Sequence, residues 1–111
     1  MSTSQSTIDY LLDQLRQAGH VRSRKMFGEY ALYCDEKVVA LVCDDRLFVK
    51  PTTAGRKLLE RPVEAPPYPG AKKYFLIDEE LIENHERLAA LIRATAEELP
   101  IPAPRRRKAR R

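Results

Sequence analysis

Residues 29–43 read EYALYCDEKVVALVC, two apolar runs that flank the polar tripeptide DEK. Short runs rich in Tyr, Val and Leu, joined by a few polar residues, are typical of a β-hairpin. A second polar turn at 44–46 leads to another short run at 47–50, and Pro51 ends the pairing there because proline has no amide hydrogen to donate. These features predict an antiparallel meander in the middle of the chain.

The residues before the hairpin predict one strand and one helix. Residues 21–27 alternate loosely between basic and other side chains, which favours a strand at the edge of the sheet. Farther upstream, apolar residues recur at helical spacing and predict a helix over 7–18. Ser6 or Thr7 is the expected N-cap, because a short side-chain oxygen accepts a hydrogen bond from a free amide of the first turn.

The residues after the meander predict two helices and one strand. We expect helices over 54–61 and 79–98, and residues 73–77 read as one more strand. Four prolines make 62–70 a stiff, extended loop. We therefore predict an α+β domain over 7–99 in the order α-β-β-β-β-α-β-α. Its two layers are an antiparallel β-sheet, made of the meander plus one further strand, and three helices packed on it.

The length of the hairpin turn decides which residues pair. If residues 35–37 form a three-residue turn, Cys34 lies opposite Val38, and Cys43 lies opposite Glu29, five positions along the strand. At about 3.3 Å per residue the two thiols are about 16 Å apart. A disulfide needs Cα atoms within about 7 Å. We therefore expect two free cysteines, in agreement with a reducing compartment.

Both faces of the predicted sheet are apolar. One face carries Tyr30, Leu32, Val38, Ala40, Val42 and Phe48, and the other carries Ala31, Tyr33, Val39, Leu41, Leu47 and Val49. A folded monomer seldom exposes so large an apolar area. We therefore expect a protein partner or self-association at the face that the helices leave open. The alternative is that the third helix and the proline-rich loop cover it.

The positive charge of the chain is concentrated at its end. The 111 residues carry a formal charge of +4, and six basic residues lie within the last seven positions: Arg105, Arg106, Arg107, Lys108, Arg110 and Arg111. The rest of the chain holds 14 basic and 16 acidic residues, a net charge of −2. We expect residues 100–111 to be a disordered, proline-rich and basic tail. Such a tail gives weak, non-specific affinity for nucleic acid by releasing counterions, or it serves only solubility.

Several classes of protein do not fit this sequence. No apolar run approaches the roughly 20 residues of a membrane span, and the polar N-terminus lacks the features of a signal peptide. We therefore expect a cytoplasmic protein with no membrane partner. Two cysteines without a CxxC spacing, two scattered histidines and four dispersed glycines match no metal, phosphate-loop or dinucleotide motif. We expect no catalytic residue, no metal and no cofactor.

Three motifs occur in order along the chain: Met26-Phe27-Gly28-Glu29-Tyr30, VALVCDDRLFVK at 39–50, and APPYPGAK at 65–72. In combination they closely resemble the N-terminal domain of the TfoX/Sxy family, and the resemblance covers about residues 8–98. Ala31 stands where the family often has glycine, which implies a slightly more crowded strand. The resemblance implies a two-layer α/β arrangement with an antiparallel sheet, and it implies no catalytic residue or cofactor.

The same resemblance implies a role in regulation. The family's named role is the regulation of natural competence in bacteria, and its full-length regulators carry a second, C-terminal domain. This chain ends in proline-spaced basic residues instead, so it looks like a stand-alone N-terminal domain. We therefore expect a non-enzymatic regulatory protein that acts by protein contacts. The alternative is a small-molecule-binding protein or an unrecognised enzyme, with a pocket between the strand at 26–30 and the loop at 65–72.

Eight residues are candidates for binding a ligand or a partner: Met26, Phe27, Gly28, Tyr30, Lys50, Tyr68, Gly70 and Lys72. Gly28 lets a partner's backbone come close, or it forms a bulge that turns the sheet. Lys50 precedes a helix start that can hold a phosphate or carboxylate, or whose threonines are simple caps. Tyr68 lies near Lys72 and can stack on a base, or its loop only braces the surface.

Overall fold

The computed structural model of the protein describes residues 3–26 and 28–100. Its elements are α1 (Gln5–Gln14), β1 (Val21–Met26), β2 (Glu29–Cys34), β3 (Lys37–Cys43), β4 (Arg46–Val49), α2 (Thr53–Leu59), β5 (Val63–Ala65), β6 (Tyr74–Ile77), α3 (Glu79–Glu83) and α4 (His85–Glu98). The six strands form one antiparallel sheet in the order β1-β2-β3-β4-β6-β5. The predicted α+β fold is confirmed, including the element order and the further strand, β6, beside the meander.

The structure differs from the predicted elements in two places: residues 63–65 of the expected loop at 62–70 form the strand β5, and the last helix is divided. Pro62 and Pro66 flank β5 instead of interrupting it, so the three residues between them pair with β6 at the edge of the sheet. The expected helix over 79–98 is two helices, because the Asn84 backbone leaves helical geometry (ψ 85°). The Asn84 side chain then caps α4 by accepting a hydrogen bond from the Arg87 amide (3.2 Å).

The β2–β3 turn is one residue shorter than predicted. Asp35 and Glu36 form it alone, and both have positive φ (51° and 71°), as in the two-residue turns that match the twist of a hairpin. Cys34 therefore lies opposite Lys37, and a bulge between β2 and β3 restores the expected register farther along. Both cysteines are buried and free, which confirms that prediction.

The β3–β4 turn is also one residue shorter than predicted. Asp44 and Asp45 form it, again with positive φ (55° and 59°), so β4 starts at Arg46. A shift of one residue moves every side chain of a strand to the other face. Leu47 and Val49 therefore face the helices and Phe48 faces away from them, so the assignment of these three residues to the faces was wrong. The shorter β2–β3 turn also exchanges two residues at the start of β3, because Val39 lies in the core and Val38 pairs with Tyr33 outside it.

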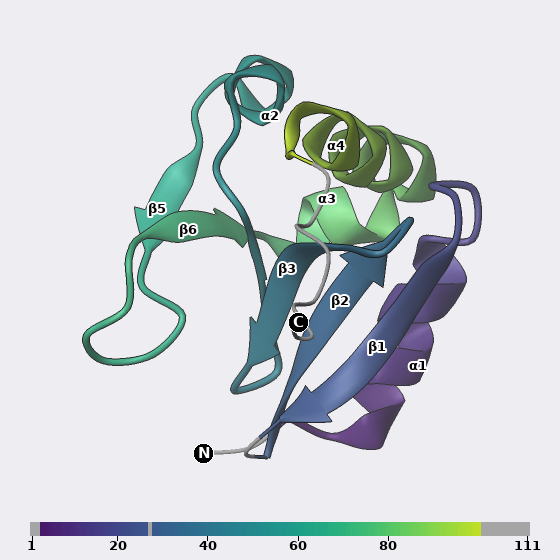
Figure 1. Ribbon diagram of the computed structural model, residues 1–111, viewed down its shortest axis with the longest axis vertical. Coiled ribbons are helices and arrows are strands. Elements are labelled where there is room, and N and C mark those ends of the chain that lie inside the picture. The colour runs from purple at the N-terminus through teal and green to yellow at the C-terminus, as the bar shows by residue number, and fades with distance from the viewer. Residues whose placement is uncertain (1–2, 27, 101–111) are drawn as a thin grey trace, which may run out of the picture.

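The helices and the sheet form two layers. Figure 1 shows α1, α3 and α4 on the same side of the meander. The hydrophobic core lies between the layers, and Leu11, Leu32, Val42, Leu88 and Ile92 are at most 2% exposed there. These residues fall on the apolar stripes of α1 and α4 and on one face of the sheet, as the spacing of apolar residues predicts.

The first helix begins two residues before its predicted start. The N-cap is Ser4, so the prediction of Ser6 or Thr7 was wrong, and the Ser4 hydroxyl accepts a hydrogen bond from the Thr7 amide (3.4 Å). The Asp45 carboxylate accepts hydrogen bonds from the Ser4 amide and the Thr7 hydroxyl, both at 2.9 Å. The bond from the Ser4 amide is the main reason that the pKa of Asp45 lies below its ordinary value. The start of α1 is thus fastened to the β3–β4 turn.

Candidate functional site

The face of the sheet opposite the helices, which we call the open face, is apolar across five strands. One row of side chains crosses it from β2 to β5: Ala31, Leu41, Phe48, Leu76 and Val63. Residues opposite one another in adjacent strands point to the same face, so this row forms a continuous apolar band. The prediction that both faces of the sheet are apolar is confirmed.

The open face contains a hollow of about 580 Å³, which we call the open-face hollow. Its lining is Met26, Glu29, Tyr30, Val38, Leu41, Cys43, Lys50, Tyr68 and Tyr74. Ligand sites typically have volumes of about 300–1,000 Å³ and a mainly apolar lining with a few polar groups. The hollow lies between the proline-rich loop and the adjoining ends of β1 and β2, which carry Met26 and Tyr30. The sequence suggested an alternative pocket at this place, but residues 26–30 are not one strand, since β1 ends at Met26 and β2 begins at Glu29.

The structure brings four of the eight candidate residues together. Met26, Tyr30, Lys50 and Tyr68 all line the open-face hollow. Gly28, Gly70 and Lys72 do not line it, and Lys72 is exposed on the loop before β6. Phe27 and the basic residues at 105–111 lie outside the described residues.

Five lining residues were missed by the sequence reasoning: Glu29, Val38, Leu41, Cys43 and Tyr74. Leu41 and Cys43 alternate along β3, so a strict period of two indicates that they share a face. Tyr74 reaches the hollow only because β6 pairs with β4, and no local pattern in the sequence reveals that pairing.

Two ionisable side chains in the hollow are neutral at pH 7. Burial, and after it the nearby Glu29 carboxylate, raises the pKa of the Cys43 thiol. Burial, and after it Tyr68, raises the pKa of the Tyr74 hydroxyl. A protonated thiol is a poor nucleophile. These side chains therefore offer apolar contacts and hydrogen bonds to a bound group, and Cys43 is not an activated nucleophile.

Glu29 and Lys50 are the charged residues of the lining. The Glu29 carboxylate accepts hydrogen bonds from the Thr3 hydroxyl (2.6 Å) and the Asp44 amide (3.1 Å), so the chain itself engages this charge. Lys50 forms no ion pair with any residue in 3–26 or 28–100. The Lys50 ammonium is therefore available to a bound group.

The helix start that follows Lys50 is occupied by a carboxylate of the chain itself. Glu98, at the end of α4, accepts hydrogen bonds from the Thr53 amide (2.8 Å) and the Ala54 amide (2.9 Å). These bonds, with that from Ala54 first, lower the pKa of Glu98. Thr52 is the N-cap and accepts a hydrogen bond from the next free amide of the helix. The anion at this helix start is thus internal, and it joins α2 to α4.

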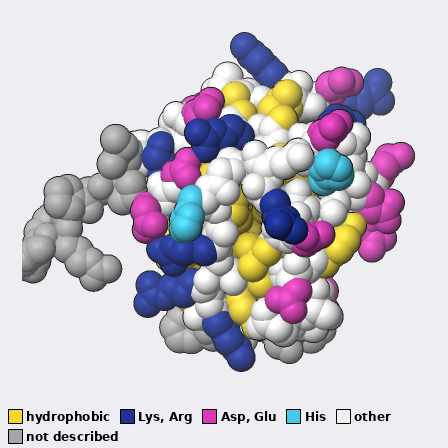
Figure 2. Space-filling model, turned by 90° about the vertical axis from the view of Figure 1, so that its right-hand side faces the viewer, with side chains coloured by type: hydrophobic (Ala, Val, Ile, Leu, Met, Phe, Trp, Pro, Cys, Tyr) yellow, Lys and Arg dark blue, Asp and Glu magenta, His cyan; other side chains and the backbone are white. Residues whose placement is uncertain are grey.

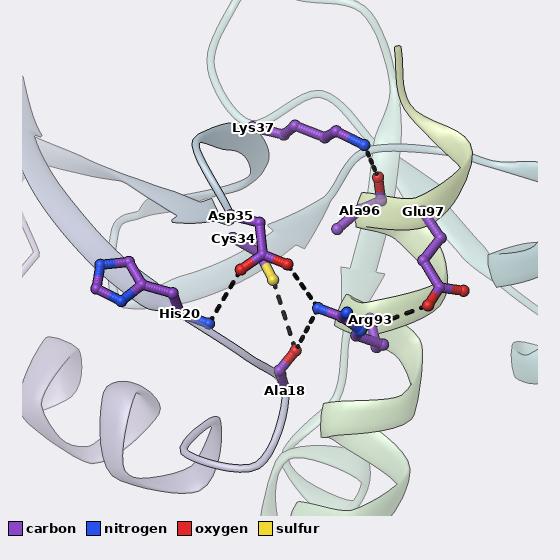
Figure 3. Close-up of polar contacts among 8 residues, drawn as sticks. All are labelled: Ala18, His20, Cys34, Asp35, Lys37, Arg93, Ala96 and Glu97. Carbon is purple, nitrogen blue, oxygen red and sulfur yellow. Dashed lines mark hydrogen bonds and ion pairs between the residues drawn. The ribbon is translucent and has the colours of Figure 1, made fainter. Parts of the chain in front are cut away.

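A polar cluster joins the α1–β1 loop, the β2–β3 turn and α4 (Figure 3). The Asp35 carboxylate accepts hydrogen bonds from the His20 amide (3.2 Å) and from Arg93 Nη1 (2.6 Å), and Arg93 also donates to the Ala18 carbonyl (3.3 Å). The Cys34 thiol donates to the same carbonyl (3.6 Å), and burial is the main reason that its pKa is raised. Figure 3 shows the His20 ring pointing away from Cys34, so the two do not form a nucleophile–base pair and the cluster is structural.

The described residues meet neither the requirements of a metal site nor those of a membrane span. Within 3–26 and 28–100, no group of three His, Cys, Asp or Glu side chains is placed to hold a metal ion. Over the same ranges, no helix has both the length and the apolar character needed to cross a membrane. The longest described helix, α4, has 14 residues, and a span takes about 20.

Known sequences place this chain in a family. The profile of the TfoX N-terminal domain matches residues 13–99, a range that contains every lining residue of the open-face hollow. A protein of Spirochaeta aurantia, described as an uncharacterized 12.7 kDa protein in the trpE 5′ region, is 47% identical over 108 residues, which is 97% of this chain and 93% of that protein. The profile match covers most of the chain and agrees with the three motifs, so the chain belongs to the TfoX N-terminal domain family.

Proposed function

We propose that this chain is a non-enzymatic regulatory protein that acts in the cytoplasm by binding a partner protein. The observation that carries the proposal is the open-face hollow, whose lining is mainly apolar. Figure 1 shows that α1, α3 and α4 lie together on one side of the meander, and the hollow is on the other face of the sheet. Ala31 and Phe48 of the apolar row are buried, so the exposed apolar surface lies at the rim, at Met26 and Tyr68. Exposed apolar surface beside a hollow is typical of interaction sites. Membership of the TfoX N-terminal domain family supports a regulatory role, since regulation is the role for which that family is named.

The rim of the hollow has the character of a recognition surface. Met26 and Tyr68 lie on opposite sides of it, in β1 and in the proline-rich loop, and they are 38% and 57% exposed. A flexible thioether adapts to different side chains, and tyrosine is enriched among the residues that dominate binding energy. An apolar side chain of a partner would displace water from Leu41 and Tyr74 inside the hollow, while Lys50 would attract an acidic group beside it.

Photo-crosslinking from the rim tests this proposal. A benzophenone amino acid replaces Tyr68 in the full chain, and the matched control carries it at Tyr10, which is 46% exposed on α1. We expect a discrete protein adduct from position 68 that is absent from position 10 and is lost when Met26→Glu places a charge on the rim. An adduct of two copies of this chain identifies self-association as the contact. Absence of any adduct from position 68, or equal adducts from both positions, contradicts a partner at the hollow.

A small apolar anion in the same hollow is the second candidate. The observation that favours it is that Lys50 lines the hollow and forms no ion pair with another described residue. The volume of about 580 Å³ also suits a small molecule. Native mass spectrometry of the purified full chain distinguishes the candidates. If the native chain carries the extra mass of a bound small molecule, and Lys50→Gln loses it, the small-anion candidate is supported. If the native chain has the mass of the polypeptide alone and position 68 still gives the adduct, the protein partner is supported.

The basic residues at 105–111 supply a second, weaker activity in this proposal. Six cations that contact phosphates release counterions and give an affinity that falls steeply with salt and ignores base sequence. The test compares binding of random duplex DNA by the full chain and by a variant with these six residues replaced by glutamine. We expect the variant to lose the salt-dependent binding, and unchanged binding contradicts a role for the tail.

A further inference from the structure

We propose that the free edge of β1 binds an extended, acidic peptide segment of a partner protein, which adds to the sheet as one more strand. This inference rests on the proposed role in protein binding, and it assigns a partner chemistry to a surface separate from the open-face hollow. The proposal rests on two features that lie side by side at this edge. Backbone groups without a partner lie at this edge beside three cations, Arg22, Arg24 and Lys25.

The outward backbone groups of β1 can be identified from one hydrogen bond. The Asp35 amide donates to the His20 carbonyl (2.9 Å), so the backbone of His20 faces β2. Groups alternate in direction along an antiparallel strand. Those of Val21, Ser23 and Lys25 therefore face away from β2, and no residue in 3–26 or 28–100 pairs with them. A row of unpaired amides and carbonyls is a template for another strand.

The cations give this edge its selectivity. Arg24 and Lys25 are exposed, and neither forms an ion pair within the described part of the chain. Arg22 pairs with Glu36 (3.1 Å) and stacks on the Tyr33 ring, with its guanidinium carbon 4.3 Å from the ring centre. Figure 2 shows Lys and Arg side chains, with Asp and Glu side chains among them, on the side of the molecule where α1 and β1 lie. Arg22 and Arg24 share one face of β1, with Tyr33 and Ala31 opposite them in β2, and Lys25 lies on the other face. Glutamate or aspartate at alternate positions of an added strand would lie opposite Arg22 and Arg24.

A second copy of this chain is a poor occupant of the edge. Pairing of β1 with its own counterpart would bring Arg and Lys side chains against one another, and like charges across a strand pair are destabilising. The other edge of the sheet, β5, offers only three residues. Its acidic residue, Glu64, already pairs with Arg56 in the same chain (2.9 Å). The charge pattern therefore favours an acidic segment from a different protein.

Nucleic acid is also a poor match to this edge. The cations suit phosphates, but the outward carbonyls of Val21, Ser23 and Lys25 need hydrogen-bond donors at the spacing of a peptide. An extended peptide supplies donors and acceptors alternately along its backbone, which is the basis of recognition by strand addition. A phosphate backbone supplies acceptors alone. The backbone edge and the cations together therefore select a peptide over a nucleic acid.

The test uses the full chain labelled with ¹⁵N and a capped heptapeptide of alternating glutamate and valine. We expect hydrogen exchange at the Val21, Ser23 and Lys25 amides to slow at least tenfold when the peptide saturates the chain. The control is the same peptide with N-methylated valines, which keeps the charge but removes the donors along one edge. We expect that control to give no protection. An unprotected β1 edge, or equal protection by both peptides, overturns the proposal.

Charge-reversal variants separate this site from the basic residues at 105–111. We expect the Arg24→Glu/Lys25→Glu variant to weaken peptide binding at least tenfold, and the glutamine variant of the six tail residues to keep the protection at β1. Arg24→Gln/Lys25→Gln provides a milder variant should charge reversal disturb folding. Protection of the same amides by oligothymidylate indicates nucleic acid at the edge and overturns the peptide. Since the hollow is untouched in these variants, the crosslink from Tyr68 reports on the proposed function independently.

Discussion

The Arg93 guanidinium lies 2.6 Å from the Asp35 carboxylate, although 58 positions separate the two residues in the sequence. The pair joins α4 to the turn between β2 and β3, and Arg93 also donates to the Ala18 carbonyl in the α1–β1 loop (3.3 Å). One side chain thus connects α4 to both the loop and the turn that flank the paired strands β1 and β2. The arrangement makes Arg93 a structural residue whose removal affects the relative positions of helix and sheet.

Replacing Arg93 with alanine is expected to lower Tm, because two hydrogen bonds between separate segments are lost. Arg16→Ala is the matched control, since Arg16, just after the end of α1, pairs with Asp13 three positions earlier (3.4 Å) and both side chains are well exposed. Exposed pairs of that kind contribute little to stability. Thermal unfolding followed by circular dichroism measures both variants, and equal Tm values for the two would contradict the structural role of Arg93.

Gly19→Ala is expected to be more destabilising than Gly70→Ala. Both glycines have positive φ (128° and 86°), so each substitution costs about 1–2 kcal/mol of backbone strain. A Cβ at Gly19 would also lie 2.8 Å from Arg93 Nη1, whereas nothing lies within 4 Å of a Cβ at Gly70. Urea denaturation gives the free energy of unfolding of each variant. Equal losses would mean that the Arg93 side chain moves aside without cost.

The strands and helices could be predicted because local patterns set them. The bounds expected for β2 are the observed ones, since residues 29–34 carry β-forming side chains between a glycine and a polar turn. Turn lengths could not be predicted. Asp35-Glu36 and Asp44-Asp45 adopt left-handed backbone conformations that glycine or asparagine usually signals, so the sequence favoured three-residue turns. The one-residue error then exchanged the two faces of β4.

Four of the eight candidate residues line the open-face hollow, and local sequence patterns were enough to find them. Met26 was a candidate because it begins the motif at 26–30, and Tyr68 because it is an aromatic residue in the proline-rich loop. Both line the open-face hollow. The hollow itself depends on long-range pairing of β4 with β6, which brings Tyr74 beside β3. The carboxylate at the start of α2 depends likewise on Glu98, 45 positions from Thr53. Contacts at such separations leave no local pattern.

Acidification is expected to destabilise the protein below about pH 4. Asp35, Asp45 and Glu98 have pKa values below their ordinary 3.8, 3.8 and 4.5, because Arg93 and backbone amides donate hydrogen bonds to the ionised carboxylates. A lowered folded-state pKa means that the unfolded chain binds protons first, so this stability is present above the ordinary pKa and is lost as pH falls through the folded-state value. We expect Tm to be flat above pH 5 and to fall steeply in acid.

Glu98→Gln isolates one contribution to this pH dependence. The variant removes the charge that accepts hydrogen bonds from Thr53 and Ala54, so we expect a lower Tm than the parent at pH 7 and a smaller difference at pH 3. Glu97→Gln is the control, since Glu97 is 67% exposed and its pair with Arg93 is longer, at 3.4 Å. A Tm difference between Glu98→Gln and the parent that grows on acidification would contradict a lowered folded-state pKa for Glu98.

The two thiols provide a probe of the open-face hollow in solution. Cys43 lines the hollow and is 6% exposed, whereas Cys34 is fully buried, so we expect iodoacetamide to modify Cys43 faster than Cys34 in the native chain. Both reactions should be slow, because burial raises both pKa values and the thiolate is the reactive form. Tyr68→Ala opens the rim and should accelerate labelling of Cys43 several-fold while leaving Cys34 unchanged.

Mass spectrometry of the labelled peptides measures these rates, with Tyr10→Ala as the matched control on α1. Because Tyr68 is more than half exposed, its removal should change the free energy of unfolding by no more than about 0.5 kcal/mol, so any acceleration reports access to the hollow. A ligand or partner in the hollow should slow the labelling of Cys43 again. Faster labelling of Cys34 than of Cys43, or no response of Cys43 to Tyr68→Ala, would mean that the hollow is not the path by which solvent reaches this thiol.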